Sequence, residues 1–131
     1  EQGGVVIANR YTTSNAVHQA SKLPAGERRE YLDWLFDLEY RRLGLPAPDL
    51  VVYLDLPTEL SEQMLRRRET ATGTQADIHE QDEEYLRSCR INARDIARDL
   101  GWTVIHCDRE GAVRTVEDIH EEIWQQVRRY L

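Results

Sequence analysis

Short apolar runs alternate along this chain with segments in which apolar residues recur at helical spacing. Three runs predict buried strands, because they are apolar without alternation, as the strands of a parallel sheet are: Gly4–Ala8, Asp49–Asp55 and Trp102–Cys107. Helical spacing and stop signals predict helices from a cap at Thr13 or Ser14 to Lys22 and over 27–43, 58–68, 82–100 and from about 116 onward. The order of these elements predicts an α/β fold with a parallel sheet and right-handed helical crossovers.

Two polar stretches lie between the second and third predicted strands. The run Arg66–Arg68 falls in the last turn of the helix that Thr58 opens, where the helix dipole favours cations. The stretch Thr70–Gln75 is small, polar and contains a glycine, so it is predicted to be a mobile loop.

The composition indicates one globular domain over residues 1–131, with 40% apolar and 31% charged residues. No apolar run approaches the ~20 residues that span a bilayer, so no membrane association is expected. The net charge of −7 argues against nonspecific binding to nucleic acid. The two cysteines, Cys89 and Cys107, are isolated and predicted to be buried and reduced, which fits the cytoplasm. No metal-ligand pattern is present, so no protein metal site is predicted.

Four polar clusters follow strand ends or flank the predicted loop. They are Asn9–Tyr11, Asp55, Asp108–Arg109, and Arg66–Arg68 together with Asp77–Glu80. Ligands of open α/β sheets bind at the carboxyl ends of the strands. All four clusters are therefore expected at one edge, where they predict a site for an anionic ligand.

These residues resemble the thymidylate kinase family. RYTTSNAVHQ (10–19) is similar to the family's Arg-Tyr signature with its Ser, polar, small and Gln positions, and PDLVVYLDLP (48–57) to its Pro-Asp-Leu strand. Arg68 and DIHE (77–80) resemble the family's lid, placed at about 66–81, and its acidic follow-on. The resemblance implies a P-loop NTPase-like, three-layer parallel sheet with helices on both faces. It also implies transfer of the ATP γ-phosphoryl group to dTMP, giving dTDP, with Mg²⁺ as cofactor.

The resemblance also implies roles for single residues, each with a structural alternative. Arg10 would clamp the acceptor phosphate and, with Arg68, be a catalytic cation. Thymine or its surroundings would be contacted by Asn15, Ser14 and Gln19. His18 would contact the sugar, and the 3′-hydroxyl side would be contacted by Asp77 and Glu80. Arg66 and Arg68 would face ATP, and Asn9 a metal-bound water.

The alternatives are ordinary structural roles for the same residues. Arg10 would then form a surface ion pair, Ser14 a helix cap, and His18 a packing contact. The arginines 66–68 would be a solvated helix end, Asp55 and Asp108 caps or turns, and Asp77 and Glu80 first-turn acids.

Three departures from the family pattern change the expectations. Asn9 stands where the family has an acid, so it adds no negative charge near Mg²⁺. Between Glu69 and His79 there is no Lys or Arg, although one branch of the family places a catalytic arginine there. No GxxxxGK[ST] segment occurs. In the family fold the strand that carries this loop lies between the strands matching Val5–Ala8 and Val51–Asp55. A gap in the sheet is therefore expected, to be filled either by an N-terminal part that these 131 residues lack or by another chain. The isolated chain is expected to be inactive.

Two other functions stay open beside dTMP phosphorylation. One is a non-catalytic nucleotide-binding or regulatory domain of the same fold, and the other is a kinase for a related deoxynucleoside or monophosphate. A homodimer is expected, because the predicted helix 27–43 carries apolar groups on more than one face: Tyr31, Trp34, Leu35, Phe36 and Leu38. The alternative is that this helix is buried against the missing N-terminal segment.

Overall fold

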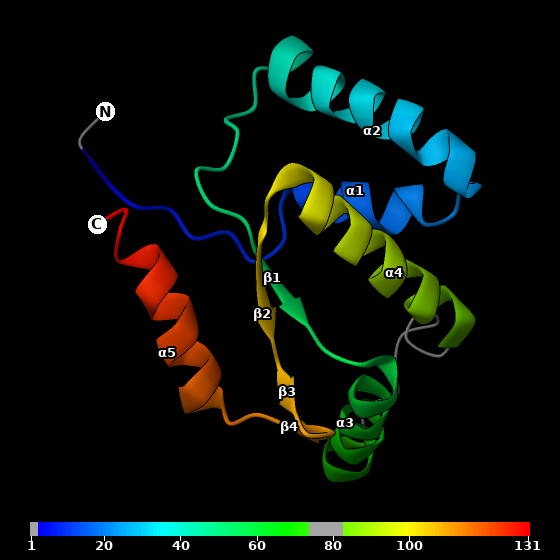
Figure 1. The fold of residues 1–131 in the computed structure, drawn as a ribbon, viewed down its shortest axis with the longest axis vertical. Helices are drawn as coiled ribbons and strands as arrows, with labels where there is room; N and C mark the ends of the chain where they lie inside the picture. The colour runs from blue at the N-terminus through cyan, green and yellow to red at the C-terminus, as the bar shows by residue number, and fades with distance from the viewer. Residues whose placement is uncertain (1–2, 74–82) are drawn as a thin grey trace.

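The computed structural model describes residues 3–73 and 83–131 (Figure 1). Its helices are α1 (Thr12–Ala20), α2 (Arg28–Phe36), α3 (Thr58–Thr72), α4 (Glu83–Leu100) and α5 (Val116–Val127), with a 3-10 turn η1 (Ala25–Glu27) and a π-helical turn η2 (Asp37–Arg42). Its strands are β1 (Val52–Asp55), β2 (Thr103–His106), β3 (Asp108–Arg109) and β4 (Ala112–Val113). The α/β class predicted from the sequence is confirmed.

The parallel sheet consists of β1 and β2, which pair with Val52 opposite Thr103 and Asp55 opposite His106. Two of the three predicted strands are therefore present and adjacent. Figure 1 shows α5 on one side of this strand pair and α1, α2 and α4 on the other. The strands thus lie between helices, as a parallel sheet requires.

The predicted strand Gly4–Ala8 is wrong for this structure. Residues 3–8 form no strand, and the side chains of Val5, Val6 and Ile7 are exposed, Val6 by 90%. A strand is held by hydrogen bonds to a neighbour, and within the described residues β1 pairs only with β2. No strand of residues 3–73 or 83–131 pairs with this apolar run, so it stays irregular.

The core lies where α1, α2 and α4 meet. Ala16, Leu35 and Ile96 are buried there, one from each helix. The remaining apolar side chains of this cluster are partly buried and pack around it: Tyr31, Leu32, Phe36 and Trp102. On α4 the predicted apolar face is confirmed except at its end, since Leu100 is 47% exposed.

A polar residue completes the buried face of α4. Asn92 is buried, and its amide donates to the backbone carbonyl of Val17 at 2.8 Å and to that of Ala16 at 3.3 Å. A buried amide costs little when it is hydrogen-bonded. Asn92 therefore fastens α4 to α1 in a position that the apolar pattern does not reveal.

Two predicted helix ends differ from the structure. The N-cap of α1 is Tyr11, not Thr13 or Ser14. Helix α3 continues to Thr72 and ends at Gly73, whose φ of 66° is the left-handed conformation that stops helices. Arg66–Arg68 therefore lie in the body of α3, and residues 70–72 are helical rather than a loop. No helix within the described ranges is long and apolar enough to cross a membrane.

Candidate functional site

The start of α1 combines a strained arginine with an uncapped helix end. Arg10 has φ 66°, which is uncommon for a residue other than glycine, and its Nε donates to Ser14 Oγ at 2.8 Å. The N-cap residue Tyr11 makes no side-chain capping hydrogen bond to any described residue, and the first turn of the helix contains no acid. The free N–H groups and the guanidinium give this end a positive character that suits an anion.

The sequence predicted that the Asn9–Tyr11 cluster lies at the carboxyl end of the strands. This prediction is wrong, since the cluster does not lie at the carboxyl end of β1. The Tyr11 hydroxyl donates to the Pro46 carbonyl at 3.1 Å, in the segment that leads into β1. Thr13 lines a cavity together with Val51 and Thr103, at the beginnings of both strands. The physical reason is the unpaired segment 3–8, since no strand carries the residues after it to the opposite edge.

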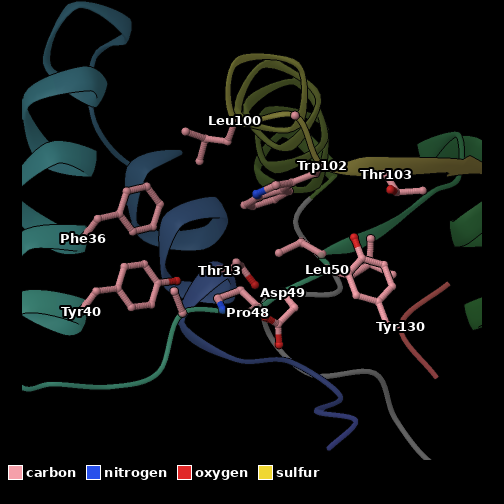
Figure 2. Close-up of a pocket in the computed structure, with 13 residues that line it drawn as sticks. Thr13, Phe36, Tyr40, Pro48, Asp49, Leu50, Leu100, Trp102, Thr103 and Tyr130 are labelled. Carbon is pink, nitrogen blue, oxygen red and sulfur yellow. The ribbon is translucent and has the colours of Figure 1, made fainter. Parts of the chain in front are cut away.

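That cavity has a volume of about 440 Å³ and is shown in Figure 2. Aromatic side chains surround it, with Phe36 and Tyr40 on one side and Trp102 and Tyr130 facing them. Thr13 is the one residue of α1 in its lining. Arg10 and Asn15 therefore share no wall of this cavity.

Asn15 and Gln19 are exposed residues of α1, one helical turn apart. The Asn15 amide nitrogen donates to Glu39 Oε1 of η2 at 3.0 Å. Glu39 is buried, with 6% of its surface exposed, and its second oxygen has no hydrogen-bond partner among the described residues. Asn15, the amide predicted to contact the base, is thus hydrogen-bonded to the buried acid Glu39, which the sequence did not mark as a candidate.

His18 lies half-buried against α4. Its Nδ1 is 3.4 Å from the Tyr85 hydroxyl and 3.6 Å from Cys89 Sγ, and Cys89 in turn is 3.2 Å from Ser21 Oγ. Burial, followed by the neighbouring Cys89, raises the pKa of Tyr85. This environment matches the packing role that was the alternative for His18. The positions of Cys89 and Cys107 confirm the prediction of buried, free thiols.

The lid arginines lie on the exposed surface of α3. Arg66 and Arg67 line a shallow hollow of about 340 Å³ with Thr70 and Ala71. Arg66 is 4.0 Å from Glu83 at the start of α4, and both side chains are largely exposed. Arg68 is exposed as well. Asp77 and Glu80 lie outside the described residues.

Asp55 forms the most buried charged contact described. Its side chain is 2% exposed and binds Arg90 through two hydrogen bonds, while Arg94 Nε lies 3.7 Å and His106 Nδ1 3.5 Å from Oδ2. The hydrogen bond to Asp55 raises the pKa of Arg90. The carboxylate is thus held by two arginines of α4 and lies beside the His106 ring of β2, rather than being a helix cap.

The sequence reading missed the hairpin of β3 and β4. Asp108 pairs with Val113 and Arg109 with Ala112, across a two-residue turn at Glu110 and Gly111, both with positive φ. An acid-glycine pair between extended residues was the available signal.

Beyond the hairpin, Arg114 joins β2 to α5. It donates to the His106 carbonyl at 2.6 Å, to Asp118 at 2.8 Å and to Glu122 at 2.6 Å. The hydrogen bonds to Asp118 and Glu122 raise the pKa of Arg114, and the hydrogen bond from Arg114 lowers the pKa of Asp118. Together with the hairpin they place Asp108 and Arg109 close to α5, where Arg109 lies 3.3 Å from Asp118.

A family model described as thymidylate kinase matches residues 1–123. Thymidylate kinase of Mycobacterium tuberculosis strain H37Rv is 34% identical over 108 residues, which are 79% of this chain and 50% of that protein. The probable thymidylate kinase of Pyrococcus abyssi is 31% identical over 123 residues, 94% of this chain and 51% of that protein. Thymidylate kinase of Danio rerio is 28% identical over 127 residues, which are 94% of this chain and 49% of that protein. The chain spans about half the length of these curated relatives, and no solved structure matches it.

Proposed function

The chain belongs to the thymidylate kinase family, and we propose from this membership that its protein transfers the γ-phosphoryl group of ATP to dTMP. The observation that carries the proposal is the family match over residues 1–123, which includes Arg10, Asn15 and Arg68. Phosphoryl transfer of this kind depends on positioning and on neutralising charge. Arginine side chains and a helix start that carry positive charge suit that chemistry.

Arg10 is proposed to hold the acceptor phosphate. Its left-handed backbone costs on the order of 1–3 kcal/mol, and strain of this kind is concentrated at functional sites. The Ser14 hydroxyl holds the guanidinium Nε beside the uncapped start of α1. Two further guanidinium nitrogens remain for bidentate contact with phosphate oxygens.

The other side chains of α1 are proposed to bind the rest of dTMP. Asn15 and Gln19 are exposed on adjacent turns and carry amides that can pair with a base edge. His18 would lie along the sugar. Asp77 and Glu80 are proposed near the 3′-hydroxyl by their position in the family motif.

ATP is proposed to lie on the side of Arg66 and Arg68, which α3 keeps exposed. The 131 residues contain no GxxxxGK[ST] segment, so we propose that a loop outside them holds the ATP phosphates. The strand bearing that loop would lie between residues 5–8 and β1 in a three-layer, P-loop-type sheet.

Asn9 is proposed as a contact for a water bound to Mg²⁺. Its side chain is exposed and its amide oxygen is a hard, neutral ligand atom, which fits an outer contact to a hydrated Mg²⁺ ion. When bound, the ion neutralises charge on the phosphoryl oxygens.

A coupled assay tests the proposal by measuring ADP release from ATP and Mg²⁺ with dTMP, dUMP, dGMP or dCMP. The full-length gene product is expected to release ADP fastest with dTMP. In the same protein Asn15→Ala should weaken dTMP binding far more than ATP binding. Nucleotide binding without ADP release would instead identify a non-catalytic domain, and faster turnover with another monophosphate would identify a related kinase.

A further inference from the structure

The contact between Asn15 and Glu39 joins an exposed amide to a buried acid. Asn15 comes from α1 and Glu39 from the π-helical turn η2, 24 residues further along the chain. The amide nitrogen lies 3.0 Å from Glu39 Oε1. Glu39 is fixed by its burial, so Asn15 is the partner whose orientation the contact decides.

A hydrogen bond to a carboxyl oxygen needs a donor, and of the two polar groups of the Asn15 amide only the NH₂ donates. The NH₂ group of Asn15 therefore faces Glu39, as the 3.0 Å contact of its nitrogen with Oε1 shows, and turning the amide over would place two oxygens against each other. Amide orientation is normally ambiguous, and here the acid removes the ambiguity. The Asn15 carbonyl oxygen is left directed away from Glu39, as a free acceptor on the exposed side of α1.

The burial of Glu39 costs free energy, which makes this residue a poor choice for a contact that only holds two helices together. Its second oxygen, Oε2, is buried and lacks a hydrogen-bond partner among the described residues. A buried unsatisfied polar atom costs free energy and calls for an explanation other than stability. The π-helical turn that carries Glu39 is itself a rare element that occurs often at functional sites.

We propose that Glu39 is a positioning residue that sets the base preference of the site through Asn15. This inference rests on the proposed function, in which Asn15 meets the base. With Oδ1 fixed as an acceptor, Asn15 favours a pyrimidine that has an N–H at position 3, such as thymine. Cytosine presents an unprotonated N3, an acceptor, at the same place, so two acceptors would meet.

Isothermal titration calorimetry with dTMP and dCMP tests this preference. The wild-type protein should bind dTMP more tightly, and Glu39→Ala should lower the ratio of the two affinities by about tenfold, the effect of one hydrogen bond. Glu39→Gln preserves size and fold but offers either an acceptor or a donor, so the ratio should fall by about threefold or more. Glu30→Gln, an exposed acid of α2, is the matched control and should leave the ratio unchanged.

The same variants in an Asn15→Ala background show whether Glu39 acts through Asn15. There the Glu39 substitutions should no longer change the ratio. A ratio that stays within twofold of wild type in both Glu39 variants would overturn the inference, as would an effect that persists without the Asn15 amide. Neither result concerns whether the wild-type protein binds dTMP, so both leave the proposed function standing.

The side-chain amide signals of Asn15 in a ¹⁵N–¹H NMR spectrum give a readout without nucleotide. One N–H should be shifted and slow to exchange in the wild-type protein, and this should be lost in Glu39→Ala. Unchanged Asn15 signals in that variant would overturn the orienting role of Glu39. Failure of the wild-type protein to bind dTMP at all would overturn the proposed function, and the base preference with it.

Discussion

Arg90 and Asp55 form a two-point ion pair across the interface between α4 and the carboxyl end of β1. Arg90 Nε lies 2.7 Å from Oδ1 and Nη2 lies 3.3 Å from Oδ2. The Asp55 side chain is 2% exposed and that of Arg90 is 27% exposed. The pair therefore fixes where the strand meets the helix, with the carboxylate shielded from water and the arginine partly exposed.

Removal of Arg90 should destabilise the fold strongly. In Arg90→Ala the Asp55 carboxylate stays buried without its main partner, and such an orphaned charge costs about 3 kcal/mol of unfolding free energy. Urea denaturation at neutral pH measures this cost. The control is Arg94→Ala, whose nitrogen is 3.7 Å from Asp55 on a side chain that is 57% exposed, with an expected cost below about 1 kcal/mol. If both variants lost the same unfolding free energy, the two-point ion pair would stabilise the fold no more than the Arg94 contact does.

Alkaline pH should destabilise the protein through Tyr53. Burial, aided by the charge of Asp55, raises the pKa of Tyr53 from 10.0 to about 12. The folded pKa is above the unfolded one, so this contribution is complete below pH 10 and is lost as the pH rises toward 12. Urea midpoints across this range should fall less in Tyr53→Phe than in the wild-type protein. Absorbance at 295 nm should show a tyrosine that titrates near pH 12 and is missing from the variant. If this titration persists in Tyr53→Phe, the raised pKa belongs to another tyrosine.

Arg10→Gly should separate stability from nucleotide binding. Glycine adopts φ 66° without strain, so the unfolding free energy should rise by about 1 kcal/mol. The guanidinium is lost at the same time, so the affinity for dTMP should fall. Thermal unfolding and calorimetric titration measure the two effects. Arg10→Lys serves as the control, because it keeps both the strain and a positive charge; a drop in stability for Arg10→Gly would contradict the argument.

Trp34 is expected to lie in a homodimer interface, which we propose on the outer face of α2. Its side chain is 56% exposed and its ring lies 5.7 Å from that of Tyr31, whereas Leu35 of the same helix is buried in the core. Trp34→Glu should weaken the dimer by at least about tenfold, since interface tryptophans often contribute about 2 kcal/mol or more. Light scattering at several concentrations measures this. Asp33→Asn is the matched control, and a wild-type protein that is monomeric at micromolar concentration would rule the interface out.

Local pattern was sufficient where a segment's own periodicity decides its structure. The buried face of α4, the parallel strands β1 and β2, and the helix that ends before Gly44 were all predictable in this way. Residues 3–8 were not, because an apolar run becomes a strand only when another strand pairs with it. The same dependence on a distant partner explains why Asn9–Tyr11 lies near Pro46 instead of near Asp55.

The contacts that were missed join residues far apart in the sequence. Asp55 stood out at a strand end, but Arg90 and Arg94 look like ordinary exposed cations of an amphipathic helix. Glu39 gave no signal at all, since an acid in a polar helix segment is normally solvated. Its burial follows from the way η2 packs on α1, which no local pattern encodes. The functional roles of Arg10, Asn15 and the other predicted site residues remain predictions for the experiments above.

In the widened turn η2, the number of residues is as important for the position of Glu39 as the residue types are. In the stretch after Phe36 the backbone bonds reach back five residues, as the Leu43 amide does to the Leu38 carbonyl at 2.9 Å. Deleting one residue between Phe36 and Glu39 would restore ordinary winding and change the angular position of Glu39 relative to Phe36. Glu39 would then leave Asn15 although neither residue had been replaced, so in an alignment of relatives a one-residue gap at this turn would report on the amide's orientation.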